Sequence, residues 1–67
     1  MKNRVLELCL SNGIETVKDF AKRVNIPTTQ AAALINKDDS VIIDSETIAK
    51  CLKYFNVSYE YLMALVE

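Results

Sequence analysis

The side chains best suited to recognition chemistry lie at the start of the segment 28–36, TTQAAALIN. Thr28, Thr29 and Gln30 carry hydroxyl and amide groups that can bond to the edges of bases or to polar groups of a protein. The rest of the segment is largely alanine, and none of its side chains is positively charged. A helix that reads DNA needs polar side chains for bases and cations for phosphates. This segment is poor in both, which favours a contact other than direct base reading.

Catalytic and metal-binding constellations are missing from the sequence. There is no histidine and only one glycine, and no carboxylates cluster around a nucleophile. We therefore expect no enzymatic activity, no catalytic residue, no cofactor and no small-molecule substrate. Cys9 and Cys51 lie in apolar helical patterns without a CxxC spacing. This placement favours two reduced, buried thiols over a disulfide or a metal site.

Length and charge limit the class of protein further. A chain of 67 residues, 51% of them hydrophobic, has room for one small domain. The formal charge is −1, so the basic balance typical of nucleic-acid binders is missing, although the charge on one face matters more than the sum. No apolar run approaches the roughly 18 residues of a membrane span, and no cleavable signal precedes the first expected helix. We expect a cytoplasmic protein without membrane contact.

Periodicity and capping residues predict an all-α fold of five short helices, with no convincing strand. Thr16, Asp44 and Ser58 are expected to act as N-caps. A loop is expected over residues 37–43, in which one of Ile42 and Ile43 fills the core. The expected helices cover about residues 3–11, 16–25, 28–36, 44–56 and 58–66.

Apolar side chains at helical spacing predict the inward faces of these helices. In the segment 28–36, Ala31 and Leu34 form the inward pair. Ala32, Ala33 and Ile35 cannot all face inward as well, because the five positions together sweep most of the way around a helix. Some of these three side chains are therefore expected on the surface. The other expected inward residues are Val17, Phe20, Ala21, Val24, Ile48, Cys51, Leu52 and Phe55. In the last helix, one side is expected to carry Tyr59, Leu62, Met63 and Val66.

The stretch GIETVKDFAKRVNIPTTQAAALIN, followed after a loop by DSETIAKCLKYFNVSYEYL, resembles the helix-turn-helix domains of phage repressors and Cro proteins, the XRE family. The resemblance covers nearly the whole chain. It implies a single five-helix, lambda-repressor-like domain over residues 1–67, with the helix-turn-helix at about 16–36. It also implies that residues 28–36 would lie in the major groove if DNA were bound.

The chain departs from that family's pattern where phosphates and bases are held. Val17 stands where the family often has glutamine, and Ala33 stands where it often has a long polar or basic side chain. Asp38 and Asp39 replace basic residues after the reading helix, and their carboxylates would repel a phosphate. The cations left for backbone contacts, if DNA is bound, are Lys22, Arg23 and Lys37.

Two functions remain open. In the first, the chain resembles the modulators of repression, or antirepressors, that sit beside repressors in temperate-phage switches. It would bind a repressor protein and mask its basic DNA-binding surface, with an apolar centre of Ala33 and Ile35 inside a polar rim. The candidate contact residues are Thr28, Thr29, Gln30, Ala32, Ala33, Ile35, Asn36, Lys37, Asp38 and Asp39.

The alternative is a Cro-like regulator that binds operator DNA directly. It would pair as a dimer through Tyr59, Tyr61, Met63 or Leu65 and read half-sites with the polar residues at 28–30. The charge balance and the composition of 28–36 favour the partner-binding function over this one. We then expect duplex binding by the isolated chain to be weak, without operator preference, and lost as salt rises to physiological concentration.

Overall fold

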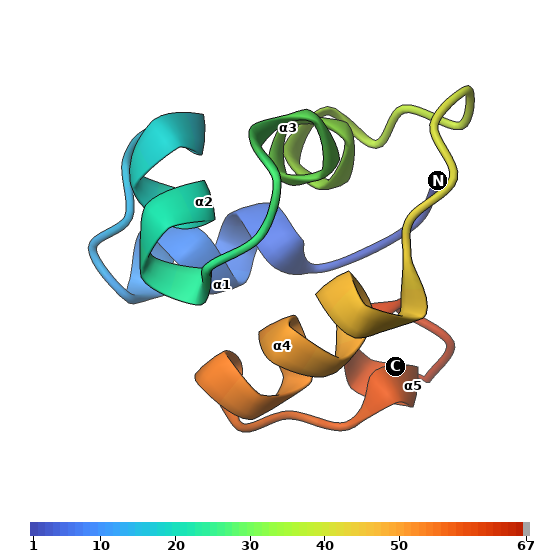
Figure 1. The fold of residues 1–67 in the computed structure, drawn as a ribbon. Helices are drawn as coiled ribbons and strands as arrows, with labels where there is room; N and C mark the ends of the chain where they lie inside the picture. The colour runs from blue at the N-terminus through green and yellow to red at the C-terminus, as the bar shows by residue number, and fades with distance from the viewer. Residues whose placement is uncertain (67) are drawn as a thin grey trace.

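In the computed structural model, which describes residues 1–66, five helices pack around one core (Figure 1). No strand occurs within these residues, so the all-α prediction is confirmed. Within the same range, no helix is long and apolar enough to cross a membrane. The helices are α1 Val5–Ser11, α2 Val17–Val24, α3 Thr28–Asn36, α4 Ser45–Phe55 and α5 Tyr59–Leu62.

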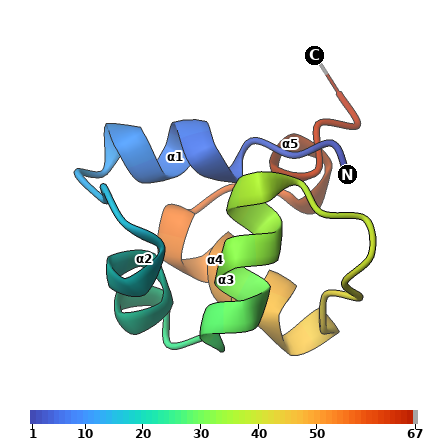
Figure 2. The same cartoon turned by 90° about the horizontal axis from the view of Figure 1, so that it is seen from above.

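A tight turn at residues 25–27 joins α2 to α3, and the two helices pack against each other. Asn25 adopts the left-handed conformation with φ 62°, and the amide of Ile26 bonds back to the carbonyl of Ala21 at 3.0 Å. These features close the end of α2. Pro27 cannot continue a helix but is tolerated before one. In Figure 2, α1 begins beside the end of α3 that is far from this turn, and the segment before α1 passes that end.

Side-chain caps begin α2 and α5 as the sequence predicts. Thr16 Oγ1 accepts the amide of Asp19 at 3.0 Å, and Ser58 Oγ accepts the amide of Tyr61 at 3.2 Å. Each bond satisfies one of the free amides of a first helical turn. Asp44 precedes α4 in an extended conformation, but its side chain accepts no cap bond. The predicted side-chain cap at Asp44 is therefore wrong.

All five helices and the two inter-helix turns near α2 contribute apolar side chains to the core. The predicted inward faces of α2 and α3 are confirmed, and Ile43 packs against the core while Ile42 is 88% exposed. The expected extension of the last helix to residue 66 is wrong, because α5 is only one turn long, ends at Leu62 and buries Leu62 alone. The buried core residues are Val5, Cys9, Ile14, Phe20, Ala21, Val24, Ile26, Ala31, Leu34, Cys51 and Leu62.

Both cysteines are free and buried in this core, as expected from their apolar surroundings. Burial raises the pKa of the Cys9 thiol to about 11. Burial, followed by the charge of a Cys9 thiolate, raises the pKa of the Cys51 thiol to about 12. Because the thiolate is the reactive form, both side chains act as small apolar groups at neutral pH.

Asn3 ties the start of α1 to the end of α3. Its side chain is buried, Oδ1 accepts the amide of Val5 at 3.0 Å, and Nδ2 donates to the carbonyl of Leu34 at 3.1 Å. Residue 3 is thus used as a polar bridge outside the helix, which is why α1 begins at Val5 rather than at residue 3. One amide group satisfies orphan groups at the ends of two helices.

We predict that Asn3→Ala lowers the free energy of unfolding by about 1–3 kcal/mol, because it leaves the amide of Val5 without its partner and removes the shorter of the two bonds to the Leu34 carbonyl, which also accepts the Lys37 amide at 3.4 Å. Urea denaturation followed by circular dichroism measures the change. Asn36→Ala is the matched control, since Asn36 is exposed on α3 and its loss should change stability by less than about 0.5 kcal/mol. Equal effects of the two substitutions would contradict the bridging role.

Candidate interaction surface

Only one side of α3 faces outward. Thr28, Thr29 and Asn36 are exposed and Ala32 is half-buried. These four residues lie at positions i, i+1, i+4 and i+8, which gather on one side of a helix; we call them the α3 stripe. The exposure expected for the two threonines, Ala32 and Asn36 is therefore found. The stripe offers two hydroxyls and one amide, and no charge.

Gln30 points away from the α3 stripe and holds the loop that follows α3. Its Nε2 donates to the carbonyl of Ile42 at 3.3 Å, and its Oε1 accepts the amide of Asp44 at 3.0 Å. Both ends of the side-chain amide are therefore engaged inside the molecule. The structure gives Gln30 an internal role in place of the contact with bases or a partner that the sequence predicts.

Ala33 is only 3% exposed, so its predicted place at the centre of a contact surface is wrong. It lies one turn after Gln30 on the same side of α3, where the loop 37–44 folds back. The amide of Asp38 also bonds to the carbonyl of Ala33 at 3.0 Å. The loop therefore covers this side of the helix, which the sequence pattern alone left open.

The apolar surface beside the α3 stripe is a hollow of about 80 Å³ between α1, α2 and α3. Ile35 is half-buried, packs against the core and forms one wall, so it contributes to the surface only through this edge. Leu6 and Leu10 of α1 form the opposite wall and are 37% and 59% exposed. We call this feature the α1–α3 hollow. Its lining residues are Leu6, Cys9, Leu10, Ile14, Glu15, Thr16, Val17 and Ile35.

Sequence reasoning missed the two leucines of this wall, although a signal was present. Apolar residues fill nearly all of positions 5–10, more than one helix face can bury. Val5 and Cys9, four residues apart, are the buried pair, so Leu6 and Leu10 on the neighbouring side must face outward. Counting the two i, i+4 pairs would have placed an apolar wall on the surface of α1.

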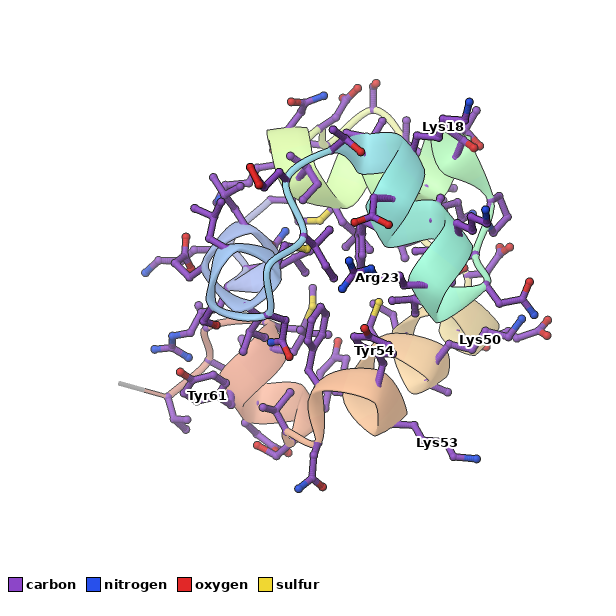
Figure 3. The ribbon with its side chains drawn as sticks, turned by 90° about the vertical axis from the view of Figure 1, so that its left-hand side faces the viewer. Lys18, Arg23, Lys50, Lys53, Tyr54 and Tyr61 are labelled. Carbon is purple, nitrogen blue, oxygen red and sulfur yellow. The ribbon has the colours of Figure 1, made fainter. Side chains whose placement is uncertain are left out.

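Arg23 is not free to hold a phosphate. The neighbouring Tyr54 and Asp19 side chains raise the pKa of Arg23. Nε pairs with the Asp19 carboxylate at 3.1 Å, and a further N–H reaches the carbonyl of Asn12 at 3.5 Å. Figure 3 shows Arg23 and Tyr54 pointing toward each other between α2 and α4. Of the predicted backbone contacts on α2, Lys22 alone is exposed without an ion pair among residues 1–66.

The loop after α3 carries its acidic groups in fixed positions. Lys37 ends α3 in the left-handed conformation with φ 55°. The carboxylate of Asp38 accepts the amide and the hydroxyl of Ser40 at 2.9 and 2.6 Å, which lowers the pKa of Asp38. Asp39 is exposed and pairs with the amino group of Met1. Among these groups, the Asp38 carboxylate takes part in no ion pair within residues 1–66, whereas the Asp39 carboxylate is paired with the Met1 amino group.

Comparison with models of protein families, with curated proteins and with solved structures gave no match for the chain. The geometry of α3 and its surroundings is therefore the basis for the function.

We predict that Gln30→Ala loosens the loop without unfolding the core. Loss of its bond to the Asp44 amide should raise the native-state hydrogen-exchange rate of that amide about fivefold, which corresponds to about 1 kcal/mol. Amide-resolved NMR measures the rate. Thr29→Ala, on the exposed side of the same helix, is the matched control and should leave that rate unchanged. An unchanged rate in the Gln30 variant would show that the clamp does not operate in solution.

Proposed function

We propose that the chain is a small helix-turn-helix regulator of the phage repressor and Cro type that modulates repression by binding a repressor protein. The order of α2, the tight turn at 25–27 and α3 supports the helix-turn-helix assignment. Because a fold does not fix an activity, the function rests on the surface. The observation that carries the proposal is the open apolar α1–α3 hollow beside the α3 stripe.

The polar groups left on α3 argue against direct base reading. Two side chains on this helix, Gln30 and Asn36, carry an amide able to bond an adenine in two places. Gln30 is engaged by the loop, and Asn36 is the last residue of α3, far from the helix start that enters a major groove. Thr28 and Thr29 offer single hydroxyls, which discriminate bases weakly. Arg23, the nearest guanidinium on α2, is paired with Asp19. Little of the chemistry that reads a major groove is therefore available.

The same surface suits contact with a protein. Protein interfaces commonly have an apolar centre inside a polar rim. The α1–α3 hollow supplies the centre, with Leu6, Leu10 and Ile35 as its walls, and the α3 stripe supplies hydroxyl and amide groups at one edge. An apolar side chain of the partner seated in the hollow would remove the exposed leucines from water.

The acidic loop gives a reason for the partner to be a repressor. The surface with which a repressor grips operator phosphates is basic. The carboxylate of Asp38 is exposed and held in place by the amide and hydroxyl of Ser40, which lower its pKa, and Asp39 lies beside it. Opposite charges steer the encounter and align the two proteins. Occupation of the repressor's basic surface would exclude the operator and relieve repression.

A Cro-like dimer that binds operator DNA is the second candidate function. It is favoured by one observation, an apolar surface at the carboxyl-terminal end of the molecule. Tyr59, Tyr61 and Leu65 are 47%, 43% and 65% exposed. Met63, the fourth residue expected in such a dimer, packs partly against the core. The guanidinium of Arg4 also lies 4.5 Å from the centroid of the Tyr61 ring, which covers part of this surface.

We predict that Leu10→Asp abolishes association with the proposed repressor partner, because it places a charge on the wall of the hollow. Leu10 is already 59% exposed, so the melting temperature should change by only a few degrees. Isothermal titration calorimetry on the co-expressed pair measures binding. An affinity loss of at least about 100-fold is expected, on the scale of an interface hot spot.

Ile42→Asp is the matched control, since Ile42 is 88% exposed and lies outside the hollow. It should bind the repressor as the unsubstituted chain does. Equal weakening by both substitutions would contradict the hollow as the binding site. A chain that never associates with the repressor, yet binds its operator selectively at physiological salt, would establish the Cro-like alternative.

A further inference from the structure

Lysine side chains from α2 and α4 form a continuous row on a face that the α3 stripe and the α1–α3 hollow do not include. Lys18 and Lys22 lie one turn apart on α2 and are exposed. Lys50 of α4 donates to the carbonyl of Asn25, the residue that ends α2, at 2.9 Å. Lys53 lies one turn further along α4 and is exposed. We call Lys18, Lys22, Lys50 and Lys53 the lysine row; Figure 3 shows the three labelled members along one side of the view.

The positive charge of this row is largely uncompensated. Among residues 1–66, Lys18, Lys22 and Lys53 take part in no ion pair. Lys50 is 3.6 Å from a carboxylate oxygen of Glu46, which is itself 81% exposed, so solvent weakens that pair. Asp19 lies near the start of the row, but Arg23 already neutralises it. A chain with a formal charge of −1 therefore concentrates positive charge on one face.

The row lacks the apolar centre that a protein partner would need. Within α2 and α4, both wholly described, the only large hydrophobic side chain that is exposed is Tyr54. Its side chain points toward Arg23, between α2 and α4 (Figure 3). Protein interfaces draw on a buried apolar core, whereas a phosphate backbone is held by cations alone through the release of counterions.

We propose that the lysine row binds the sugar-phosphate backbone of duplex DNA without reading its sequence. The contact is made by α2 and α4 and not by the α3 stripe, so base edges are not involved. This inference does not depend on the repressor-binding function, because it concerns the isolated chain and a different face. It assigns the weak duplex binding expected from the sequence to four lysine side chains. Of these, only Lys22 was predicted from the sequence as a backbone contact.

The test measures how the affinity for a fluorescent duplex of arbitrary sequence falls with salt, by anisotropy, for the whole chain. Four phosphate contacts give a slope of log K against log salt of about −3.6. The double variant Lys22→Gln/Lys53→Gln should reduce the size of that slope by about 2, and so should Lys18→Gln/Lys22→Gln, which alters α2 alone. Leu10→Asp should leave the salt slope unchanged. Failure of DNA binding by the lysine row can therefore be distinguished from failure of the repressor-binding proposal.

The control is Lys2→Gln, which removes an exposed positive charge that lies outside the lysine row. Its slope should remain that of the unsubstituted chain. An equal loss in this control, or an unchanged slope in both row variants while circular dichroism shows native helicity, would overturn the proposal. Binding of polyglutamate as tight as that of the duplex at the same salt would also overturn it, and would assign the row to an acidic polypeptide.

Discussion

The constraint on which the surface depends is that α3 is held on three sides. α2 packs along it from the turn at 25–27, Asn3 bonds to the carbonyl of Leu34 at its far end, and Gln30 fastens the following loop to a third side. Each contact uses a group that could otherwise recognise something else. What remains on α3 is a narrow stripe without charge, and recognition has to draw on neighbouring elements.

Those neighbours divide the surface into regions of different chemistry. α1 places Leu6 and Leu10 beside Ile35, which creates an apolar hollow at one edge of α3. The loop after α3 carries carboxylates, whereas α2 and α4 carry the lysine row. The net charge of −1 hides this separation. A small domain with limited buried area gains from such division, since a partner, a basic surface and a phosphate backbone can meet different faces.

Much of the fold could be predicted from the sequence, because the helix starts and the inward faces depend on residues close together in the chain. The i, i+3, i+4 spacing located the inward faces of α2 and α3, and Thr16 and Ser58 identified two helix starts. The candidate site was harder to predict, because the exposure of its side chains depends on contacts between residues that are distant in sequence. Nothing near Gln30 reveals that Ile42 and Asp44 will engage it, and nothing near Ala33 shows that a loop covers it. The composition of residues 28–36 showed that α3 has few polar side chains. Only the packing shows which of these side chains remain free to bind.

The central claim is that α3 presents itself to a protein and does not read DNA. Selection of bound duplexes from a random-sequence library, with the isolated chain at physiological salt, tests this claim most directly. The account predicts that successive rounds enrich no sequence, because the hydroxyls of Thr28 and Thr29 are the only groups at the start of α3 left for bases. Enrichment of one motif, lost on substitution of either threonine by alanine, would contradict it.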